Sequence, residues 1–388
     1  MDAQTRPVTD TLVIGMGAIG AFYAYILEKS GRTRVTAIAR GNYEALKESG
    51  FTMINTDTGD VANWRPHRLM SSLDQALDRT YAFVVLATKA IPEVTTTRDV
   101  VAPLLGLTYD GAHPQPAFVF MQNGIDVEED IYVTLSQKVP SQNPRLISTA
   151  LWVHMHMRDS VTVEYNNFGH IDIGDYLPPT VDRQVGVVVS PVATEFSETL
   201  KAGGTKVVLT ADIGRLKYMK NAWNLCFNMV PALTRLSCDA IFGSPDTHIP
   251  PAGLSAKDSP QDVPLTSGSP GSPEGVVASL PRASPLIGDY TIPMMLNLLF
   301  EVYDLGSLLY PPTSGGPNLD HAAALSILTV TAKAYASGAM KHVPSTLADV
   351  RAGRPIELEV ILGSVVRLGR QRGMAQPVSA MLDMVSCG

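Results

Sequence analysis

The sequence predicts an α/β fold in two parts, an N-terminal doubly wound parallel sheet and a C-terminal all-helical domain. Three observations predict it. Short apolar strands alternate with helical segments through the first half of the chain, a glycine-rich turn separates the first strand from the first helix, and only helical periodicity continues after about residue 195. The 388 residues are enough for two domains of ordinary size.

The strands of the first half are short apolar runs, each followed by glycine or polar residues. Because strand and helix alternate, neighbouring strands are expected to run parallel with right-handed crossovers. The segment from Thr162 alternates polar and apolar residues as an antiparallel edge strand does. The expected elements are strands at Thr11–Ile14, Arg34–Ala39, Tyr81–Leu86, Ala117–Phe120, Arg145–Trp152 and Ser160–Ile173, with a helix at Ala21–Ser30.

The second half of the chain is expected to be helical. We place a nucleotide-binding domain over residues 1–185 and a helical domain over residues 186–388. Between about 243 and 286, proline, serine and glycine leave too few large apolar residues to order the chain, so we expect a flexible insertion there. The expected helices are Glu195–Ala202, Ile213–Leu236, Ile292–Leu309, Ala322–Ser337 and Glu357–Arg370.

Composition excludes several classes of function. The formal net charge is −7 and no basic run stands out, so no nucleic-acid partner is expected. The apolar stretch 292–310 contains Glu301 and Asp304, which favours a core helix over a membrane span. The three cysteines have neither disulfide nor metal-site spacing, and the flank of the apolar run 11–27 lacks a positive cluster. We therefore expect a cytoplasmic protein without a metal or membrane site.

A Gly-x-Gly-x-x-Gly sequence occupies the turn between the first strand and the first helix. Gly15 permits a tight turn, Gly17 lets backbone amides approach a pyrophosphate, and Gly20 allows close helix–strand packing. The helix N-terminus adds N–H donors and a partial positive charge. A Rossmann-type dinucleotide site is predicted, and a glycine turn without a ligand is the alternative. The predicted binding residues are Gly15, Met16, Gly17, Ala18, Ile19 and Gly20.

The end of the second strand indicates which dinucleotide binds. A site for NAD places Asp or Glu there to bind the ribose 2′-hydroxyl. In this chain Arg40 stands there and no acid follows it. A guanidinium can bind a 2′-phosphate through its planar fork of donors, so NADP, as NADPH, is the predicted cofactor. A surface arginine without a phosphate is the alternative.

Two further loops follow the carboxyl ends of predicted strands, where open α/β sheets bind their ligands. Lys89, in the loop 87–90, could neutralise phosphate or substrate charge. Asn123, in the loop 121–124, could bond the nicotinamide ribose or the reacting carbonyl. Each is equally consistent with a plain loop residue, since Asn-Gly is a common turn pair.

Lys220, Asn224 and Asn228 recur at four-residue spacing inside a helical segment. Groups four residues apart drift by only about 40° around a helix and therefore share one stripe. The neighbouring residues are apolar, and burying an ammonium or an amide without partners is costly. We interpret the stripe as a site for a polar ligand such as a carboxylate. An ordinary core helix with satisfied polar groups is the alternative.

Together these motifs resemble the ketopantoate reductase (2-dehydropantoate 2-reductase) family. The most specific pieces are the lysine–asparagine stripe and a run near the C-terminus, because many other reductases share the glycine loop. The pieces occur in family order: Ala18–Gly20, Ala87–Ala90, Gln122–Gly124, Lys220–Asn228, Ala232–Thr234 and Ser345–Glu357.

The resemblance implies an activity and a role for each residue. The activity is NADPH-dependent reduction of a 2-oxo acid, most directly ketopantoate in pantothenate biosynthesis, in a cleft between the two domains. A small-molecule 2-oxo acid is thus the expected partner, and a homodimer is a candidate assembly. The implied roles are proton donor for Lys220, nearby acid for Glu357, substrate ligands for Asn224, Asn228 and Ser345, and cofactor-side contacts for Lys89 and Asn123.

Departures from the family pattern affect the substrate more than the reaction. His342 and Pro344 precede Ser345 where polar amides and hydroxyls are commoner in the family. Cys238 lies near a position that often holds another substrate-binding asparagine, and Arg354 changes the approach to the acid. A reductase of a different branched 2-oxo acid in a secondary pathway fits the same residues. A non-catalytic NADP-binding redox sensor is the rival from another class, although a sensor needs no catalytic lysine.

Overall fold

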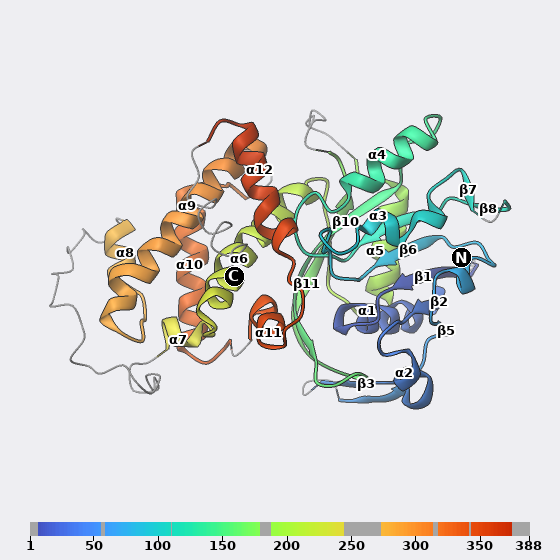
Figure 1. Ribbon diagram of the computed structural model, residues 1–388, viewed down its shortest axis with the longest axis horizontal. Helices are drawn as coiled ribbons and strands as arrows, with labels where there is room; N and C mark the ends of the chain where they lie inside the picture. Colours follow the sequence, from blue (N-terminus) through green and yellow to red (C-terminus); the bar gives the residue numbers. More distant parts are fainter. Residues whose placement is uncertain are drawn as a thin grey trace, which may run out of the picture. The chain divides into compact units, whose positions relative to one another are not determined.

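The chain forms two compact units, residues 1–220 and 221–388 (Figure 1). The structure is a computed structural model that describes residues 7–55, 59–109, 111–178, 188–243, 273–312, 317–340 and 343–374. The first unit is α/β and the second is helical, as the sequence predicted. The predicted domain boundary at residue 185, His342 and most of the predicted insertion lie outside the described residues and stay predictions.

The described part of the first unit contains a ten-stranded mixed sheet in the order β4-β3-β11-β10-β9-β6-β1-β2-β5, with β12 paired to β11. The run from β10 to β5 is parallel, whereas β10 and β11 are antiparallel. The strands are β1 (Thr9–Ile14), β2 (Thr33–Ile38), β3 (Phe51–Ile54), β4 (Val61–Trp64), β5 (Arg68–Met70), β6 (Phe83–Leu86), β9 (Ala117–Phe120), β10 (Leu146–Met157), β11 (Thr162–Asp175) and β12 (Val207–Leu209), with a separate hairpin of β7 (Thr108–Tyr109) and β8 (His113–Pro114).

The strand order reverses at β1. The chain passes from β1 to β2 on one side and later returns to β6 on the other side. In open α/β sheets such a reversal leaves a crevice beyond the carboxyl ends of the strands, because the connecting helices lie on opposite faces. The glycine loop follows β1, so the fold places it at this crevice.

Helices α1 (Ala18–Lys29) and α5 (Pro191–Ala202) contact each other and share one hydrophobic core with the sheet. Tyr23 and Leu27 of α1 and Phe196 of α5 are fully buried in this core. Alternate strand residues such as Leu12 and Val84 point to the other face and are also buried, so both faces are covered. The remaining α-helices of this unit are α2 (Tyr43–Ser49), α3 (Thr97–Val100) and α4 (Glu129–Lys138).

Helix α6 (Ile213–Thr234) crosses the boundary between the units at Lys220. Its second half is central to the helical unit: the Trp223 indole donates to Thr331 on α10 at 3.2 Å, and the Cys226 thiol to the Met295 carbonyl on α9 at 3.8 Å. The other helices are α7 (Asp239–Phe242), α8 (Pro273–Ser279), α9 (Ile292–Leu309), α10 (His321–Ala336), α11 (Ser345–Arg351) and α12 (Ser364–Gln371), with π-helical turns at Ile287–Thr291 and Glu359–Gly363.

One helical stretch in the described residues, Ile287–Leu309, is long and apolar enough to cross a membrane by length and composition alone. Half of its most apolar window is buried inside the unit, where α9 packs against α10. Cys226 and Cys238 are buried free thiols.

Three sequence expectations need correction. β11 is antiparallel to β10, but it is not an edge strand, because β3 and β12 pair along its other side. Residues 273–279, expected inside the insertion, form α8 and bury Val277. The helix expected over 357–370 begins with the π-helical turn Glu359–Gly363.

Gly20→Ala tests the packing of α1 on the glycine loop. A Cβ at Gly20 would lie 1.8 Å from the Gly15 carbonyl oxygen, so we expect the substitution to lower the free energy of unfolding by about 1–3 kcal/mol. Gly41→Ala is the control, because nothing lies within 4 Å of a Cβ there, and its effect should stay within about 0.5 kcal/mol. Urea unfolding of both variants measures the difference, and equal stabilities would contradict the packing argument.

Candidate active site

The glycine loop brings its backbone against the neighbouring β6 loop. Gly15 has a φ of 98°, and a Cβ there would lie 2.7 Å from the Thr88 amide nitrogen. Gly17 faces open space, since a Cβ there would have nothing within 4 Å, and it precedes α1 without any side-chain cap. The first turn of α1 also contains no acidic residue. An uncapped helix N-terminus beside open space suits an anion such as a pyrophosphate.

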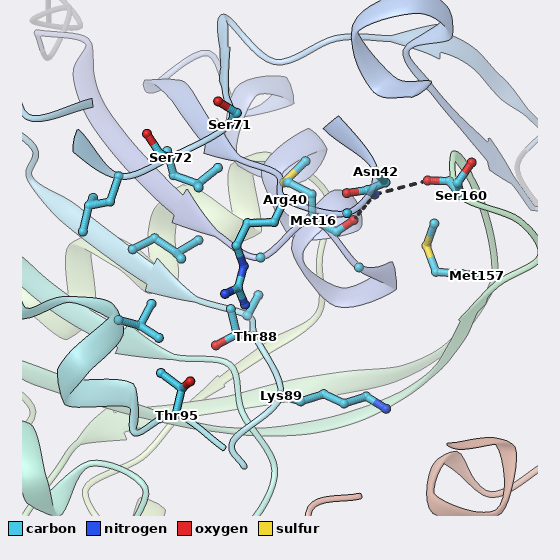
Figure 2. A pocket seen from close by; sticks show the side chains of 18 of the residues that line it. Met16, Arg40, Asn42, Ser71, Ser72, Thr88, Lys89, Thr95, Met157 and Ser160 are labelled. Atoms are coloured by element: carbon cyan, nitrogen blue, oxygen red, sulfur yellow. Dashed lines mark hydrogen bonds between the residues drawn. The ribbon is translucent and has the colours of Figure 1, made fainter. Parts of the chain in front are cut away.

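A cavity of about 650 Å³ lies beyond the carboxyl ends of the strands in the first unit (Figure 2). Five predicted residues line it: Gly15, Met16, Gly17, Arg40 and Lys89. Ala18, Ile19 and Gly20 form the first turn of α1 and are not among the residues that line it. Its size is that of an ordinary small-molecule or cofactor site.

Arg40 reaches the cavity from the end of β2 with its guanidinium directed toward Thr88, and Ser71 and Ser72 line the same cavity (Figure 2). β5 pairs in parallel with β2, with Met70 opposite Ile38, so Ser71 and Ser72 follow β5 at the same edge of the sheet. Both serines line the cavity. A guanidinium and two hydroxyls are donors that a phosphate group can use.

The loops after β6 and β9 are held together by Gln122. Its side-chain amide donates to the Thr88 carbonyl at 3.0 Å and lies 3.3 Å from the Thr97 hydroxyl. This contact fixes the β6 loop that carries Lys89, which is exposed at the cavity. Asn123 is the next residue after Gln122 and is partly buried. It is not among the residues that line the cavity.

Asn42 joins the glycine loop to the tip of the β10–β11 hairpin. Its amide nitrogen lies 2.8 Å from the Met16 carbonyl oxygen and 3.2 Å from the Ser160 carbonyl oxygen (Figure 2). Asp159 is the acidic residue that lines the cavity, and its Oδ1 accepts the backbone amides of Val161 and Thr162, both at 2.8 Å. Those hydrogen bonds hold the pKa of Asp159 below its usual range.

The residues around this cavity fit a dinucleotide. The open space at Gly17 and the uncapped α1 N-terminus suit a pyrophosphate, and Arg40 adds a guanidinium to the same cavity. Within the described residues, no group of three or more His, Cys, Asp or Glu is placed to hold a metal ion.

Lys220 ends the first unit on α6 and is partly buried. Its ammonium lies over the Trp152 ring, 5.6 Å from the ring centroid. Burial, and secondly the Lys220 charge, hold the pKa of His154 below its ordinary value. One turn earlier on α6, Lys217 forms a buried ion pair with Glu128, and Glu128 also accepts the Ser148 hydroxyl. The lysine is therefore carried on a helix that is fixed to the sheet.

Asn224, Asn228 and Ser345 lie together in the helical unit. The Asn228 amide nitrogen is 3.3 Å from Asn224 Oδ1 and 3.4 Å from the Ser345 hydroxyl on α11. Both asparagines are 2% exposed, whereas Ser345 is exposed. Asn228 Oδ1 is buried and accepts no hydrogen bond within the described part of the chain. The structure thus brings the three predicted substrate residues into one polar cluster, in which Asn228 Oδ1 can accept a further hydrogen bond.

Two further polar residues of this unit, Glu357 and Asn221, are buried. Glu357, the predicted acid, is 8% exposed and stands just before the π-helical turn. Asn221 is 1% exposed and donates to the Ile361 carbonyl of that turn at 2.9 Å. A π-helical turn leaves backbone groups out of the ordinary helical pattern, so we assign Asn221 a structural role.

Known proteins match this chain over both units. Residues 11–178 match the family described as Ketopantoate reductase PanE/ApbA, and residues 289–385 match its C-terminal domain. The 2-dehydropantoate 2-reductase of Mesorhizobium japonicum is 34% identical over 253 residues, covering 61% of this chain and 70% of that protein. The chain belongs to the ketopantoate reductase family. The enzyme of the same name from Pyrobaculum aerophilum is 23% identical over 95% of this chain and 94% of its own length.

Solved structures share the fold of this chain. The 2-dehydropantoate 2-reductase of Methylococcus capsulatus is 21% identical, with a TM-score of 0.64 over 97% of this chain and 96% of that one. D-mandelate dehydrogenase, in a ternary structure with NADH and anilino(oxo)acetate, is 16% identical, with a TM-score of 0.66 over 97% of each chain.

Several residues of the site could not be predicted from the sequence. Ser71 and Ser72 were missed because the short strand before them gave no recognisable apolar run. The contacts of Asn42 and Trp152 join segments far apart in the chain, and only the paired strands reveal them. Trp152 is the last residue of the predicted strand Arg145–Trp152, and no periodicity in the sequence signals its contact with Lys220.

The titration of His154 tests its closeness to Lys220. Its NMR midpoint should lie below the ordinary 6.5, because burial and the lysine charge both disfavour a second positive charge. In Lys220→Met the midpoint should rise but stay below 6.5, since burial is the larger cause. Lys201→Met, on α5, is the control and should leave the midpoint unchanged. An unchanged midpoint in Lys220→Met would show that the two groups do not interact.

Proposed function

We propose that the protein uses NADPH to reduce a 2-oxo acid to the 2-hydroxy acid, and that 2-dehydropantoate is the leading candidate for this substrate. The ketopantoate reductase family consists of oxidoreductases. The proposed substrate and cofactor are inferred from the residues of this chain. The observation that carries the proposal is the buried pair Asn224 and Asn228, which lies on the helix that bears Lys220 one turn earlier and contacts Ser345 of α11. Polar groups buried on an apolar helix suit a small polar ligand.

Four features of the cavity support NADPH. The open side of Gly17 and the α1 N-terminus would hold the pyrophosphate, and Arg40 with Ser71 would hold the 2′-phosphate. Lys89 lines the same cavity and would add a positive charge. When bound, the reduced nicotinamide supplies a hydride to the ketone carbon. Asn123, in the loop after β9, is proposed to bind on the nicotinamide side.

Lys220 is the proposed proton donor. Reduction of a ketone leaves negative charge on its oxygen, which must be protonated or stabilised as it develops. An ammonium held against an indole ring can donate the proton and is less hydrated than one in open water. Glu357, which is largely buried, is proposed as the acid that keeps the lysine charged and oriented.

The amide cluster is the proposed substrate site. 2-Dehydropantoate carries a carboxylate and a hydroxyl besides its ketone, so it needs both donors and acceptors. Asn228 Oδ1, buried without a donor in the described residues, can accept the substrate hydroxyl. The Asn224 amide and the Ser345 hydroxyl can then bind its remaining oxygens. Assembly as a homodimer and a cytoplasmic location stay predictions from the sequence.

A spectrophotometric assay tests the proposed function. Purified protein is mixed with NADPH and 2-dehydropantoate, and the absorbance of the reduced nicotinamide is followed. We expect a substrate-dependent fall in absorbance. If the protein binds NADPH but reduces no branched 2-oxo acid, the proposed reductase activity is wrong and a redox sensor is favoured.

Lys220→Ala tests the proton donor. Loss of a general acid should lower kcat by about 10²–10⁴-fold, whereas the dissociation constant of NADPH should change little. Lys201→Ala, which removes an exposed lysine on α5, is the control and should keep full activity. If kcat of Lys220→Ala stays within about threefold of the wild-type value, Lys220 is not the proton donor. Such a small change means that the lysine contributes almost nothing to stabilising the transition state.

Arg40→Ala tests the cofactor. Removing charge-assisted hydrogen bonds to the 2′-phosphate should lower kcat/KM for NADPH by about tenfold or more and leave the value for NADH nearly unchanged. Arg98→Ala is the control, because Arg98 pairs with Asp99 on α3 and does not line the cavity. An unchanged preference between NADPH and NADH would remove Arg40 from the proposal.

A reductase of a different branched 2-oxo acid is the second candidate, and Cys238 favours it. The Cys238 thiol is fully buried and lies 3.6 Å from the Phe227 carbonyl oxygen, so it is packed in the core and offers no amide to a substrate. Burial raises the pKa of this thiol to about 12. Comparing kcat/KM for 2-dehydropantoate, 2-oxoisovalerate and benzoylformate decides between the candidates. A kcat/KM that is highest for 2-dehydropantoate supports 2-dehydropantoate as the substrate. A higher kcat/KM for either of the other two acids supports the second candidate.

A further inference from the structure

Trp152 presents its ring to the ammonium of Lys220. The ring lies on β10, and Lys220 Nζ is 5.6 Å from its centroid, within the range of about 6 Å at which a cation over an aromatic face is attracted by the ring. Tryptophan is the strongest of the aromatic side chains in this interaction. The ring is partly buried, which limits screening by water.

A buried carboxylate holds the indole in place. Trp152 Nε1 donates to Asp172 Oδ2 at 2.7 Å, and Asp172 on β11 is 2% exposed. His170, directly opposite Trp152 in the strand register, lies with its Nε2 3.2 Å from Asp172 Oδ1 and stacks on the indole at a centroid distance of 6.3 Å. Burial raises the pKa of Asp172, while the indole and the histidine lower it. Burying a carboxyl group is costly unless its hydrogen bonds are made, and here the indole makes one of them.

The strand geometry beside Trp152 is irregular. The β10–β11 register shifts between Val153 and Met155, and a Cβ at Gly169 would lie 1.7 Å from the Trp152 carbonyl oxygen. A bulge of this kind turns side chains away from their ordinary directions and is frequent next to functional sites. Gly169, with a φ of 123°, is therefore required for β11 to approach β10 at this point.

An indole face differs chemically from a carboxylate as a neighbour for an ammonium. It attracts the positive charge but has no lone pair to take up an N–H, so it leaves the donors of Lys220 to other partners. The hydrogen bond from the indole N–H to Asp172 polarises the ring and makes its face a better seat for a cation. The charge of Asp172 thus acts through the ring.

We propose that Trp152 is the aromatic seat that positions the Lys220 ammonium for proton transfer, and that Asp172 fixes the orientation of this seat. The proposal rests on the proposed role of Lys220 as proton donor. Trp152 is a positioning residue, since it acts through the lysine.

Kinetics of Trp152 variants test the seat. Trp152→Leu removes the ring and should lower kcat by about tenfold with an unchanged dissociation constant for NADPH. Trp152→Phe keeps a ring and should recover most of that loss. Asp172→Ala, which removes the acceptor for the indole N–H, should lower kcat in the same direction. Trp64→Leu is the matched control, because Trp64 packs on Tyr25 and Phe51, and it should change stability but not kcat.

An NMR measurement separates the seat from the proposed activity. Lysines are methylated with ¹³C, and the Lys220 signal is identified by its absence in Lys220→Ala. Ring currents should move the Lys220 methyl signal upfield, and the shift should vanish in Trp152→Leu and persist in Trp152→Phe. The inference is overturned if the signal is the same in wild type and Trp152→Leu, or if Phe and Leu at this position lower kcat equally. Failure of wild type to reduce any 2-oxo acid would instead defeat the proposed function and leave the NMR result standing.

Discussion

The buried ion pair between Glu128 and Lys217 is the constraint on which the arrangement of the site depends. Glu128 is 1% exposed and precedes α4, and Lys217 lies on α6. Breaking such a pair by removing one partner costs about 3–5 kcal/mol, because a charge is left buried without its partner. The pair therefore fixes the start of α6 to the sheet. Lys220 follows three residues later, so it is fixed near β10, where Trp152 meets it.

Two kinds of binding group occupy different parts of the chain. The first unit offers backbone amides at a glycine loop, a helix N-terminus and Arg40, which are groups that bind anions. The second unit offers neutral amides and a hydroxyl, which are groups that can orient a small polar molecule. Helix α6 belongs to both, since it carries Lys220 in the first unit and Asn224 and Asn228 in the second. Family membership fixes the type of enzyme, and the proposed cofactor and substrate are argued from these residues.

Local features of the site were predictable from the sequence, and long-range ones were not. The glycine loop and Arg40 follow from residue order around a strand end, and the buried asparagines follow from helical spacing. Ser71 and Ser72 depended on a three-residue strand, β5, that has little signal of its own and exists because it pairs with β2. Trp152 depends on strand register and on a bulge, neither of which can be read from periodicity.

A structure of the protein with NADP⁺ and the 2-hydroxy acid product bound tests the central claim most directly. The measurement is the distance from Lys220 Nζ to the product oxygen that was the ketone oxygen. Proton donation predicts a hydrogen bond of about 2.6–3.2 Å between these two atoms. A Lys220 side chain directed away from the bound product, with another group donating to that oxygen, would contradict the account.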